Sequence, residues 1–343
     1  MAIPIENIYY LLSYAWDTLE EKDRVKADID DGTKLLDLFA KVLLSGTRIL
    51  LKRGIEKNYV TNTAELAGVK GKLEMSPTLK SGAWLRQRTI CTIDEFSGNI
   101  LSNQILLATI YLLIRTKALD SGLKKQLKSM LWRFSGIDPI ELNGRVFNQV
   151  RLHRNNRFYS FLLKICRIIY ENTLPTEKPG EWHFMDFTRD RQKMNRLFES
   201  FIRNFYRREF PHWKVWSEQL NWQFEVSDET QRAYIPVMRT DISIQNESGK
   251  TIIDAKYYQE TLSEHFEKVK LKSHNLYQLF SYLMNQRSND PASKRTRGML
   301  IYPETGRELD LDYWYDEHLI QIKTLNLNQN WTLIEERLKA ILQ

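Results

Sequence analysis

The chain has 343 residues, of which 42% are hydrophobic and 12% aromatic, enough to bury sizeable cores in about two domains. Its 50 Lys and Arg exceed its 43 Asp and Glu, which gives a modest formal net charge of +7. The first residues lack a cationic segment followed by an apolar core, and no apolar run approaches the roughly 18 residues of a membrane span. The two cysteines suggest neither a disulfide framework nor a metal-ligand cluster. These features argue against membrane and disulfide-rich secreted proteins, and a cytoplasmic location is expected.

Apolar side chains recur at helical spacing through most of the first half of the chain. The pattern predicts helices that start around Ile8 and extend over 35–51, 99–117, 121–133 and 157–172, with extended segments at 59–75 and 89–96. Thr173 to Glu181, which contains two prolines and a glycine, marks the expected boundary between domains at 1–175 and 176–343. The first domain shows no catalytic constellation and is too long for a tether, which indicates that it binds a partner.

The second half alternates helical and strand-like patterns. In chain order these predict a helix (190–208), three strands (about 214–224, 237–244 and 251–258), a helix (274–286) and a strand (298–303). This αβββαβ succession, placed after a mixed N-terminal domain, indicates an α+β protein.

The strand-like runs 238–244 and 251–258 are joined by a turn-rich stretch that contains a glycine, and they predict an antiparallel hairpin. With a turn in the middle of that stretch, Asp241 lies opposite Asp254, and Lys256 shares their face of the sheet. Opposed strand residues have Cβ atoms roughly 4.5 to 5.5 Å apart, so the two carboxylates need neutralisation. Mg²⁺ would provide it, because this ion takes one or two carboxylates together with water and substrate phosphate.

A solvated hairpin face is the alternative, and the neighbouring helices bear on the choice. Glu199 falls at the edge of the apolar stripe of the helix at 190–208, from which its carboxylate could reach toward the metal. In the helix at 274–286, Gln278 and Tyr282 belong to a polar and aromatic stripe opposite the leucines, which suits the wall of a groove. Each of these residues could equally decorate a surface.

Basic residues concentrate after the hairpin. Between Lys268 and Arg297, seven basic residues stand against one acidic residue, and Lys and Arg that neutralise phosphates give sequence-independent affinity for nucleic acid. A second basic and aromatic cluster, from Arg145 to Tyr159, suits contact with a DNA backbone. For both segments, a solvated basic surface is the alternative.

The whole arrangement resembles the PD-(D/E)xK nuclease superfamily: carboxylates on adjacent strands in the pattern D-x12-D-A-K, a Glu on the preceding helix, and Q-x-x-x-Y on the following one. Over nearly the whole chain the sequence also resembles the McrC family, the nuclease subunits of McrBC-type modification-dependent restriction systems. The segments that carry this resemblance are NIYYLLSYAW (7–16), VKGKL (69–73), DEFSGNILSNQI (94–105), YRREF (206–210), MRTDI (238–242), IDAKYY (253–258), NLYQL (275–279) and LIYP (300–303).

The resemblance implies a DNA endonuclease that cuts only when assembled with a separate AAA+ GTPase ring, McrB, which recognises methylated cytosine and is stimulated by McrC. It implies that domain 1–175 engages the ring and that domain 176–343 is the PD-(D/E)xK endonuclease. Asp241, Asp254 and Lys256 match the family's catalytic positions, whereas Glu199, Gln278 and Tyr282 match the wider superfamily pattern. The sequence contains no G-x-x-x-x-G-K-[ST] loop, so GTP is expected on the partner.

The expected reaction is hydrolysis of a phosphodiester bond in double-stranded DNA. One or two Mg²⁺ ions, held by Asp241, Asp254 and the carbonyl of Ala255, would position and acidify the attacking water. Lys256 would stabilise charge on the scissile phosphate, and Glu199 would act through water. The alternative is a catalytically silent adaptor that clamps DNA and activates the GTPase.

Overall fold

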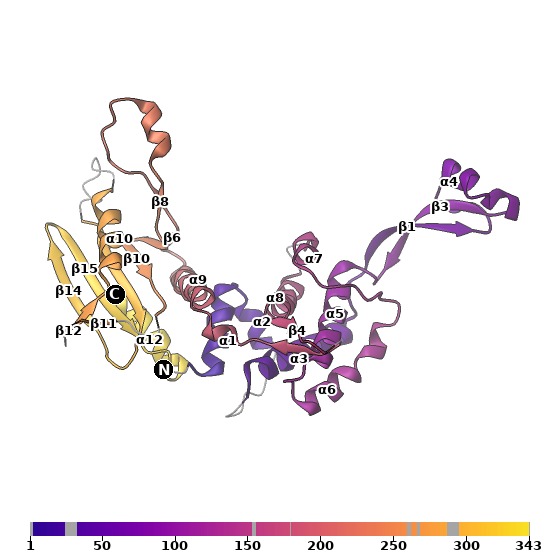
Figure 1. Cartoon of the computed structure of the whole chain (residues 1–343), viewed down its shortest axis with the longest axis horizontal. Coiled ribbons are helices and arrows are strands. Elements are labelled where there is room, and N and C mark those ends of the chain that lie inside the picture. Colours follow the sequence, from indigo (N-terminus) through magenta and orange to yellow (C-terminus); the bar gives the residue numbers. More distant parts are fainter. Residues whose placement is uncertain are drawn as a thin grey trace. The chain divides into compact units, whose positions relative to one another are not determined.

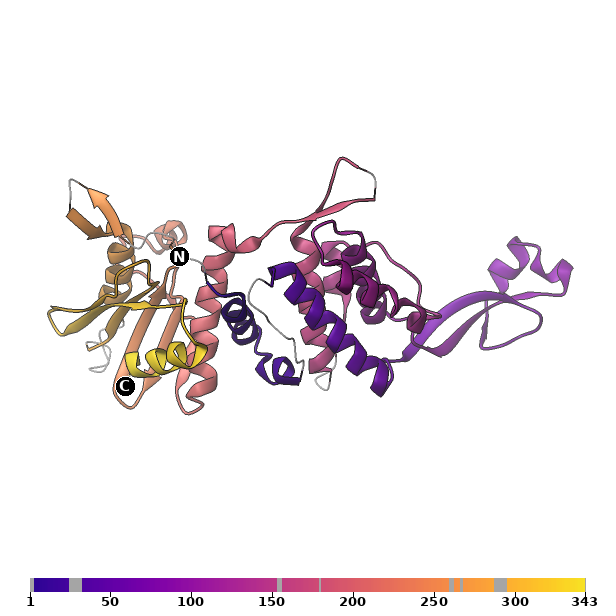
Figure 2. The ribbon, with the colours of Figure 1, turned by 90° about the horizontal axis from the view of Figure 1, so that it is seen from below.

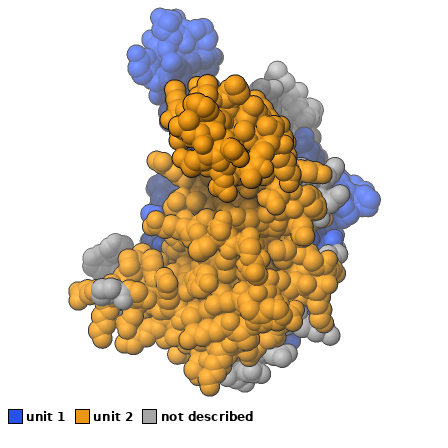
Figure 3. Space-filling model, turned by 90° about the vertical axis from the view of Figure 1, so that its right-hand side faces the viewer, with its two compact units in different colours: residues 1–22, 186–343 blue, residues 23–185 orange. Residues whose placement is uncertain are grey.

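The computed structural model describes residues 3–24, 33–152, 156–178, 180–258, 262–265, 268–286 and 295–342. The chain forms two compact units, shown in different colours in Figure 3. The C-terminal unit combines Met1–Lys22 with Asp186–Gln343, and the middle unit is Asp23–Met185.

This division differs from the expected boundary at 175/176 in two ways. The proline-containing stretch is not a linker, because β4 (Thr173–Pro175) pairs with β5 (Trp182–Phe184) in an antiparallel hairpin of the middle unit. The N-terminal helix α1 (Ile5–Ala15) belongs to the C-terminal unit, where the amide of Asn7 donates to the carbonyl of Leu327 at 2.9 Å. These long-range contacts leave no local sequence signal.

The middle unit is built mainly of helices. They are α3 (Leu35–Arg53), α5 (Leu101–Arg115), α6 (Ser121–Lys128), α7 (Gly144–Gln149) and α8 (Arg157–Glu171), and the division of the chain between Lys22 and Asp23 falls within α2 (Leu19–Arg24). α8 packs against α3 and α5 through a buried apolar face, so the helices predicted near 35–51, 99–117 and 157–172 are confirmed. The helix predicted over 121–133 ends earlier, at Lys128, and a short 3-10 turn follows at Leu131–Phe134.

A β-arm projects from the helices of the middle unit (Figures 1 and 2). Its strands β1 (Asn58–Leu66) and β3 (Thr89–Ser97) pair from Asn58↔Ser97 to Leu66↔Thr89, and β2 (Lys72–Leu73) adds to β3. The connection carries α4 (Met75–Lys80) and a 3-10 turn at Ala83–Arg86. The expected extended segment therefore ends before Met75, because Pro77 lies in the first turn of α4, where its missing N–H is tolerated.

The C-terminal unit contains a six-stranded mixed sheet in the order β14-β15-β13-β10-β9-β6. Its strands are β6 (Lys214–Trp216), β9 (Ile242–Asn246), β10 (Gly249–Ala255), β13 (Arg297–Pro303), β14 (Asp310–Tyr315) and β15 (His318–Leu325). Two small pairs accompany it, β7 (Gln219–Leu220) with β8 (Met238–Arg239) and β11 (Leu262–His265) with β12 (Lys268–Leu271). The helices are α1, α9 (Arg191–Glu209), α10 (Ser273–Met284) and α12 (Trp331–Leu342).

The sheet lies between α9 and α10 (Figure 2). α10 packs on β10 and β13, where Leu279 and Leu283 meet Ile252, Leu300 and Ile322 in one buried cluster. α9 packs on β10 and β6, and it begins at Asp190, whose side chain accepts from the backbone N–H groups of Gln192 and Lys193. None of the described helices is long and apolar enough to cross a membrane.

The predicted hairpin and its register are confirmed. β9 and β10 pair antiparallel from Gly249↔Asn246 to Ile253↔Ile242, and Asp241 and Asp254 are the next residue on each side of the last pair. The order of helix, strands, helix and final strand also agrees, although the strands expected at 214–224 and 237–244 are each broken into two. The chain is thus a mixed α and β protein, with the site at the end of its central strand β10.

Candidate active site

Asp254 lies in β10 near the middle of the sheet and is fully buried. Its Oδ1 accepts a hydrogen bond from the ammonium of Lys256 at 2.8 Å. Its Oδ2 is buried and has no hydrogen-bond partner among the described residues. Buried charges normally have all their bonding capacity filled, so one half of this carboxylate is available to a further ligand.

Asp241 precedes β9 and faces Asp254 across the hairpin. Its Oδ2 accepts from the backbone N–H of Ala255 at 3.2 Å and from the ammonium of Lys256 at 3.5 Å. The side chain of Lys256 is 14% exposed and bridges both carboxylates. The structure therefore brings together the three residues that the hairpin register predicted, with Ala255 between them.

Burial and, to a smaller extent, the charge of Asp241 raise the pKa of Asp254 to about 7, although Lys256 opposes the shift. Burial lowers the pKa of Lys256, but Asp254 and Asp241 raise it by more, so the net shift is upward and the lysine stays cationic at neutral pH. A single ammonium thus compensates a pair of carboxylates that would otherwise repel each other.

Glu199 projects from α9 toward the same site and is half-buried. Its Oε1 accepts from the amide of Asn195, whose own oxygen accepts from the backbone N–H of Tyr257 at 2.8 Å. Burial and, to a smaller extent, the nearby charge of Asp241 raise the pKa of Glu199 to about 7. Glu199 is therefore held next to the segment that follows β10 and is within electrostatic reach of Asp241.

Gln278 and Tyr282 of α10 contact each other rather than the carboxylates. The amide of Gln278 donates to the hydroxyl of Tyr282 at 2.6 Å, and that hydroxyl donates to the carbonyl of Arg239 at 2.8 Å. Tyr282 is buried in the core cluster beneath α10. These two side chains fix the backbone just before Asp241.

Asn195 and Arg203 are site residues that the sequence interpretation missed. The guanidinium of Arg203 donates to the backbone carbonyl of Asp241 at 3.2 Å. Arg191, Asn195, Glu199 and Arg203 follow each other at intervals of four, so they lie on one face of α9. This spacing of four, read from the sequence, is the signal that groups Asn195 and Arg203 with Glu199.

The donor set fits Mg²⁺ better than a closed metal cage. Across the described residues, no group of three or more His, Cys, Asp or Glu side chains is arranged to hold a metal ion. Mg²⁺ in phosphoryl-transfer sites takes one or two carboxylates and keeps waters or substrate phosphates. Asp241 and Asp254, with the unsatisfied Oδ2 of Asp254, meet that requirement.

The two basic segments predicted to contact DNA have different outcomes. Much of the tract between Lys268 and Arg297 lies outside the described residues, so that prediction remains a prediction. In the cluster from Arg145 to Tyr159, His153 and Arg154 also lie outside them, but Phe158 and Tyr159 are buried in the middle unit. The hydroxyl of Tyr159 donates to Asn103 at 2.9 Å. These two aromatics are core residues, and the expectation that they contact DNA is wrong.

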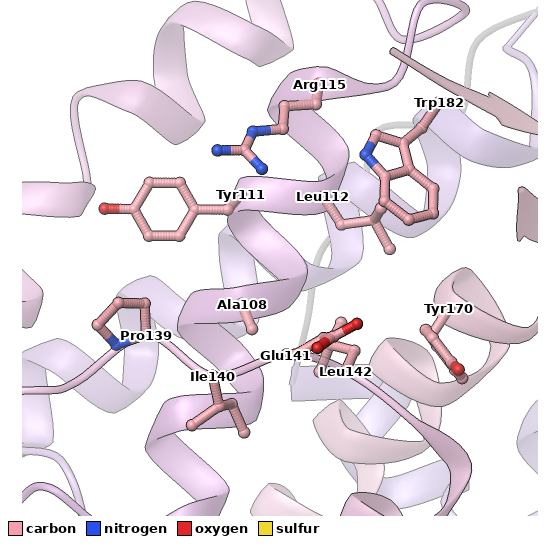
Figure 4. Close-up of a pocket in the computed structure, with 10 residues that line it drawn as sticks. All are labelled: Ala108, Tyr111, Leu112, Arg115, Pro139, Ile140, Glu141, Leu142, Tyr170 and Trp182. Atoms are coloured by element: carbon pink, nitrogen blue, oxygen red, sulfur yellow. The ribbon is translucent and has the colours of Figure 1, made fainter. Parts of the chain in front are cut away.

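A cavity of about 460 Å³ lies in the middle unit (Figure 4). It is framed by Tyr111 and Arg115 of α5, Glu141, Tyr170 of α8 and Trp182 of β5. Its described lining offers neither a carboxylate pair nor a nucleophile with an adjacent base. It is therefore a poor candidate for hydrolytic chemistry.

The fold and site define a mixed α/β protein with a paired-carboxylate and lysine centre suited to a divalent cation. The chain matches the family described as McrBC 5-methylcytosine restriction system component over residues 6–303, and it belongs to that family. Type IV methyl-directed restriction enzyme EcoKMcrBC of Escherichia coli (strain K12) is 31% identical over 339 residues, covering 99% of this chain and 97% of that protein. The family resemblance predicted from the sequence is thus confirmed.

One solved structure shows a similar fold over nearly the whole chain. The chain resembles one in a refined half-complex from a tetradecameric assembly of Thermococcus gammatolerans McrB AAA+ hexamers with bound McrC, with a TM-score of 0.60 and 17% identity over 99% of this chain and 75% of that chain. A cryo-EM structure of the Thermococcus gammatolerans McrBC complex matches 60% of this chain and 58% of that chain, with a TM-score of 0.41 and 21% identity.

Proposed function

We propose that this protein is the Mg²⁺-dependent endonuclease subunit of a GTP-dependent restriction complex that acts on DNA containing 5-methylcytosine. The observation that carries the proposal is the buried Asp254, paired with Asp241 and Lys256 and left with an unsatisfied oxygen. The family description and the name of the Escherichia coli relative support the restriction role. The order of elements around the site supports a PD-(D/E)xK nuclease domain in the C-terminal unit.

In this proposal Asp241, Asp254 and the carbonyl of Ala255 hold Mg²⁺. The bound ion would acidify the attacking water and neutralise phosphate charge. Lys256, cationic at neutral pH, stabilises the charge that develops on the scissile phosphate. Glu199, oriented by Asn195, accepts hydrogen bonds from water at the mouth of the site.

Gln278 and Tyr282 act indirectly in this mechanism. Through the carbonyl of Arg239 they hold the chain that delivers Asp241. Arg203 holds the carbonyl of Asp241 itself from the other helix. These contacts keep the two carboxylates opposed, which a metal site needs before substrate arrives.

The proposal assigns GTP hydrolysis to a separate AAA+ partner in the cytoplasm. The sequence lacks a Walker A loop, and McrC in the Thermococcus gammatolerans structure is bound to McrB AAA+ hexamers. We propose that the middle unit contacts this partner. The same contact would stimulate the partner's hydrolysis of GTP. The β-arm supports this, because it carries several large apolar side chains that are more than half exposed, among them Tyr59, Val69, Trp84 and Leu85, and exposed apolar groups that gather on one element favour a protein contact.

The test is cleavage of methylated plasmid DNA with Mg²⁺, GTP and the GTPase encoded beside this protein. Asp254→Ala should lower cleavage by more than about a hundredfold, because it removes the central carboxylate of the site. Glu247→Ala is the matched control, since it deletes an exposed carboxylate in the turn of the same hairpin and should leave cleavage unchanged. Stimulation of GTP hydrolysis should persist in both variants, which shows that they fold.

Cleavage by Asp254→Ala at the wild-type rate would contradict the assigned site. If the wild-type protein accelerates GTP hydrolysis but cuts no DNA, the protein is a DNA-clamping adaptor, and the paired aspartates are not used for catalysis.

A further inference from the structure

A cavity of about 630 Å³ opens beside the carboxylate pair, between the first half of α9 and the segment after β10. Its lining residues are Arg191, Gln192, Asn195, Arg196, Glu199, Lys256 and Tyr258. Lys256 and Glu199 mark the end nearest the proposed cleavage site. Arg191 and Arg196 give the rest of the cavity a positive character that hydrolysis itself does not require.

The arginines follow α9 away from the carboxylates. Arg191, Asn195 and Glu199 share one face of the helix, and a rise of 1.5 Å per residue separates Arg191 from Glu199 by roughly 12 Å along the axis. A phosphate at the carboxylates would therefore be out of reach of Arg191. A phosphate further along the same strand would be within reach.

Tyr258 supports this positive surface. It is buried, and its hydroxyl donates to Asn275 at 3.1 Å, so its ring is fixed in place. The guanidinium of Arg191 lies 4.4 Å from the ring centroid, and the ammonium of Lys272 lies 3.7 Å from it. One buried ring thus positions the guanidinium of Arg191 at this end of the cavity.

Both arginines are exposed, and neither forms an ion pair with a carboxylate among the described residues. Arginine offers a planar fork of donors that matches phosphate oxygens. An open cavity with such donors and no enclosing apolar wall suits a passing backbone better than a small ligand held in a closed pocket.

We infer that this cavity is a phosphate-backbone groove in which Arg191 and Arg196 bind DNA phosphates next to the scissile phosphate, with Tyr258 supporting Arg191. The inference rests on the proposed function, because it takes DNA as the substrate of the neighbouring carboxylates. Since the arginines contact phosphates outside the reacting group, they govern the affinity for DNA and the KM of cleavage, and have little effect on kcat.

The test is a titration of fluorescein-labelled duplex DNA with the full-length chain in EDTA over a series of salt concentrations. The variant carrying both Arg191→Gln and Arg196→Gln should bind about tenfold more weakly, and the slope of log K against log salt should be shallower by about 2, one for each phosphate contact. Lys193→Gln is the control, because it removes a positive charge from the same exposed helical turn outside the cavity.

Wild-type affinity and slope in the double variant would overturn the inference, and so would a wild-type chain that does not bind duplex DNA at low ionic strength. Equal unfolding midpoints for the three proteins would show that the arginine changes do not act through folding. In the cleavage assay the double variant should raise KM and leave kcat within about twofold of wild type, whereas an equal loss in kcat would place the arginines in the reaction itself.

The proposed metal site and the proposed phosphate-backbone groove can be contradicted independently of each other. If Asp254→Ala abolishes cleavage while the double variant binds DNA like wild type, the groove is wrong and the nuclease assignment stands. If the double variant loses binding and its salt slope while Asp254→Ala still cuts, the groove stands and the assigned metal site is wrong.

Discussion

Asp254 combines two properties that a stable core avoids, a buried carboxylate and an oxygen without a partner among the described residues. A fully buried charge is tolerated when it is paired and hydrogen-bonded, and here Lys256 provides only one such bond to Asp254. The unfavourable burial is confined to Asp254, because Ile253 and Ala255 on either side are fully buried apolar residues. Such a conflict with the rules of core packing is expected at functional sites.

The pH dependence of the free energy of unfolding tests whether the buried carboxylate of Asp254 destabilises the folded state. Its carboxyl has a folded pKa of about 7, above the unfolded value of about 3.9, so it favours the folded state fully below pH 4 and loses that contribution as the pH rises to 7. In EDTA, Asp254→Asn should not show this loss and should gain about 2–4 kcal/mol over wild type between pH 4 and pH 7. Thermal unfolding of both proteins across that range would measure it.

Glu199 also titrates in this window, because burial and Asp241 raise its pKa to about 7. It is present in both proteins, so its contribution largely cancels in the difference between them. If the unfolding free energies of wild type and Asp254→Asn changed with pH in parallel, a raised pKa of Asp254 would be contradicted. Mg²⁺ should raise the unfolding midpoint of the wild type more than that of the variant, because binding to the folded state stabilises it.

At the level of elements, the hairpin could be predicted because a short turn-rich stretch that contains a glycine joins two strand-like runs. The path of the chain between β7 and β8 could not be predicted in this way. It depends on contacts with distant residues, such as the indole of Trp222 donating to the carbonyl of Pro236 and the N–H of Gln223 donating to Asn285. Long-range bonds of this kind produce no periodic pattern, so unbroken strands were expected at about 214–224 and 237–244, where the chain in fact leaves the sheet.

The candidate site divides in the same way. Asp241, Asp254 and Lys256 follow from strand alternation within one hairpin. The contacts of Asn195 and Arg203 could not be predicted, because these side chains bond to backbone atoms of Tyr257 and Asp241. Every residue carries such backbone atoms, so the sequence does not reveal the partner.

The packing of α10 on β13 offers a test at this level. Gly298 in β13 leaves room for Leu279 and Leu283, and a Cβ at this position would lie 2.8 Å from Leu283 Cδ1 and 3.1 Å from Leu279 Cδ2. Gly298→Ala should therefore force α10 outward and destabilise the C-terminal unit by about 1–3 kcal/mol. Urea unfolding would measure this loss.

The shift of α10 should also reach Asp241, because Tyr282 on this helix holds the carbonyl of Arg239. Cleavage by Gly298→Ala should therefore fall by more than the fraction unfolded explains. Gly144→Ala is the control, since nothing lies within 4 Å of the added carbon and the helix there should tolerate alanine. Wild-type stability of Gly298→Ala would mean that the leucine side chains rearrange without cost.

On the scale of the whole molecule, the chain passes between its units twice, so the C-terminal unit is completed by the first residues of the sequence. Tyr14 of α1 packs against Phe201 and Phe205 of α9 with ring centroids 5.8 and 5.4 Å apart, and Tyr10 stacks on Trp331 at 4.4 Å. The middle unit is therefore inserted into the sequence of the C-terminal unit. A partner bound to the middle unit has two chain connections to the site rather than one.

This architecture predicts the behaviour of a fragment cut at the middle-unit boundary. Residues 186–343 alone expose the aromatic face of α9 and leave the carbonyls of Leu327 and Gln329 without the amide of Asn7. Because several large side chains lose their cover, the unfolding midpoint should fall by about 10 °C or more relative to the same unit in the full chain. Differential scanning calorimetry would measure it.

Restoring α1 should reverse the loss. A peptide of residues 3–22, added to the fragment, should raise its unfolding midpoint, because α1 buries its apolar face on α9 and donates from Asn7. The same peptide with Asn7→Ala and Tyr14→Ala should raise the midpoint less, since it lacks the Asn7 amide and the Tyr14 ring that contact the unit. A fragment as stable as the unit in the full chain would show that α1 contributes little, and the sequence-based boundary near residue 176 would then suffice for a folded C-terminal domain.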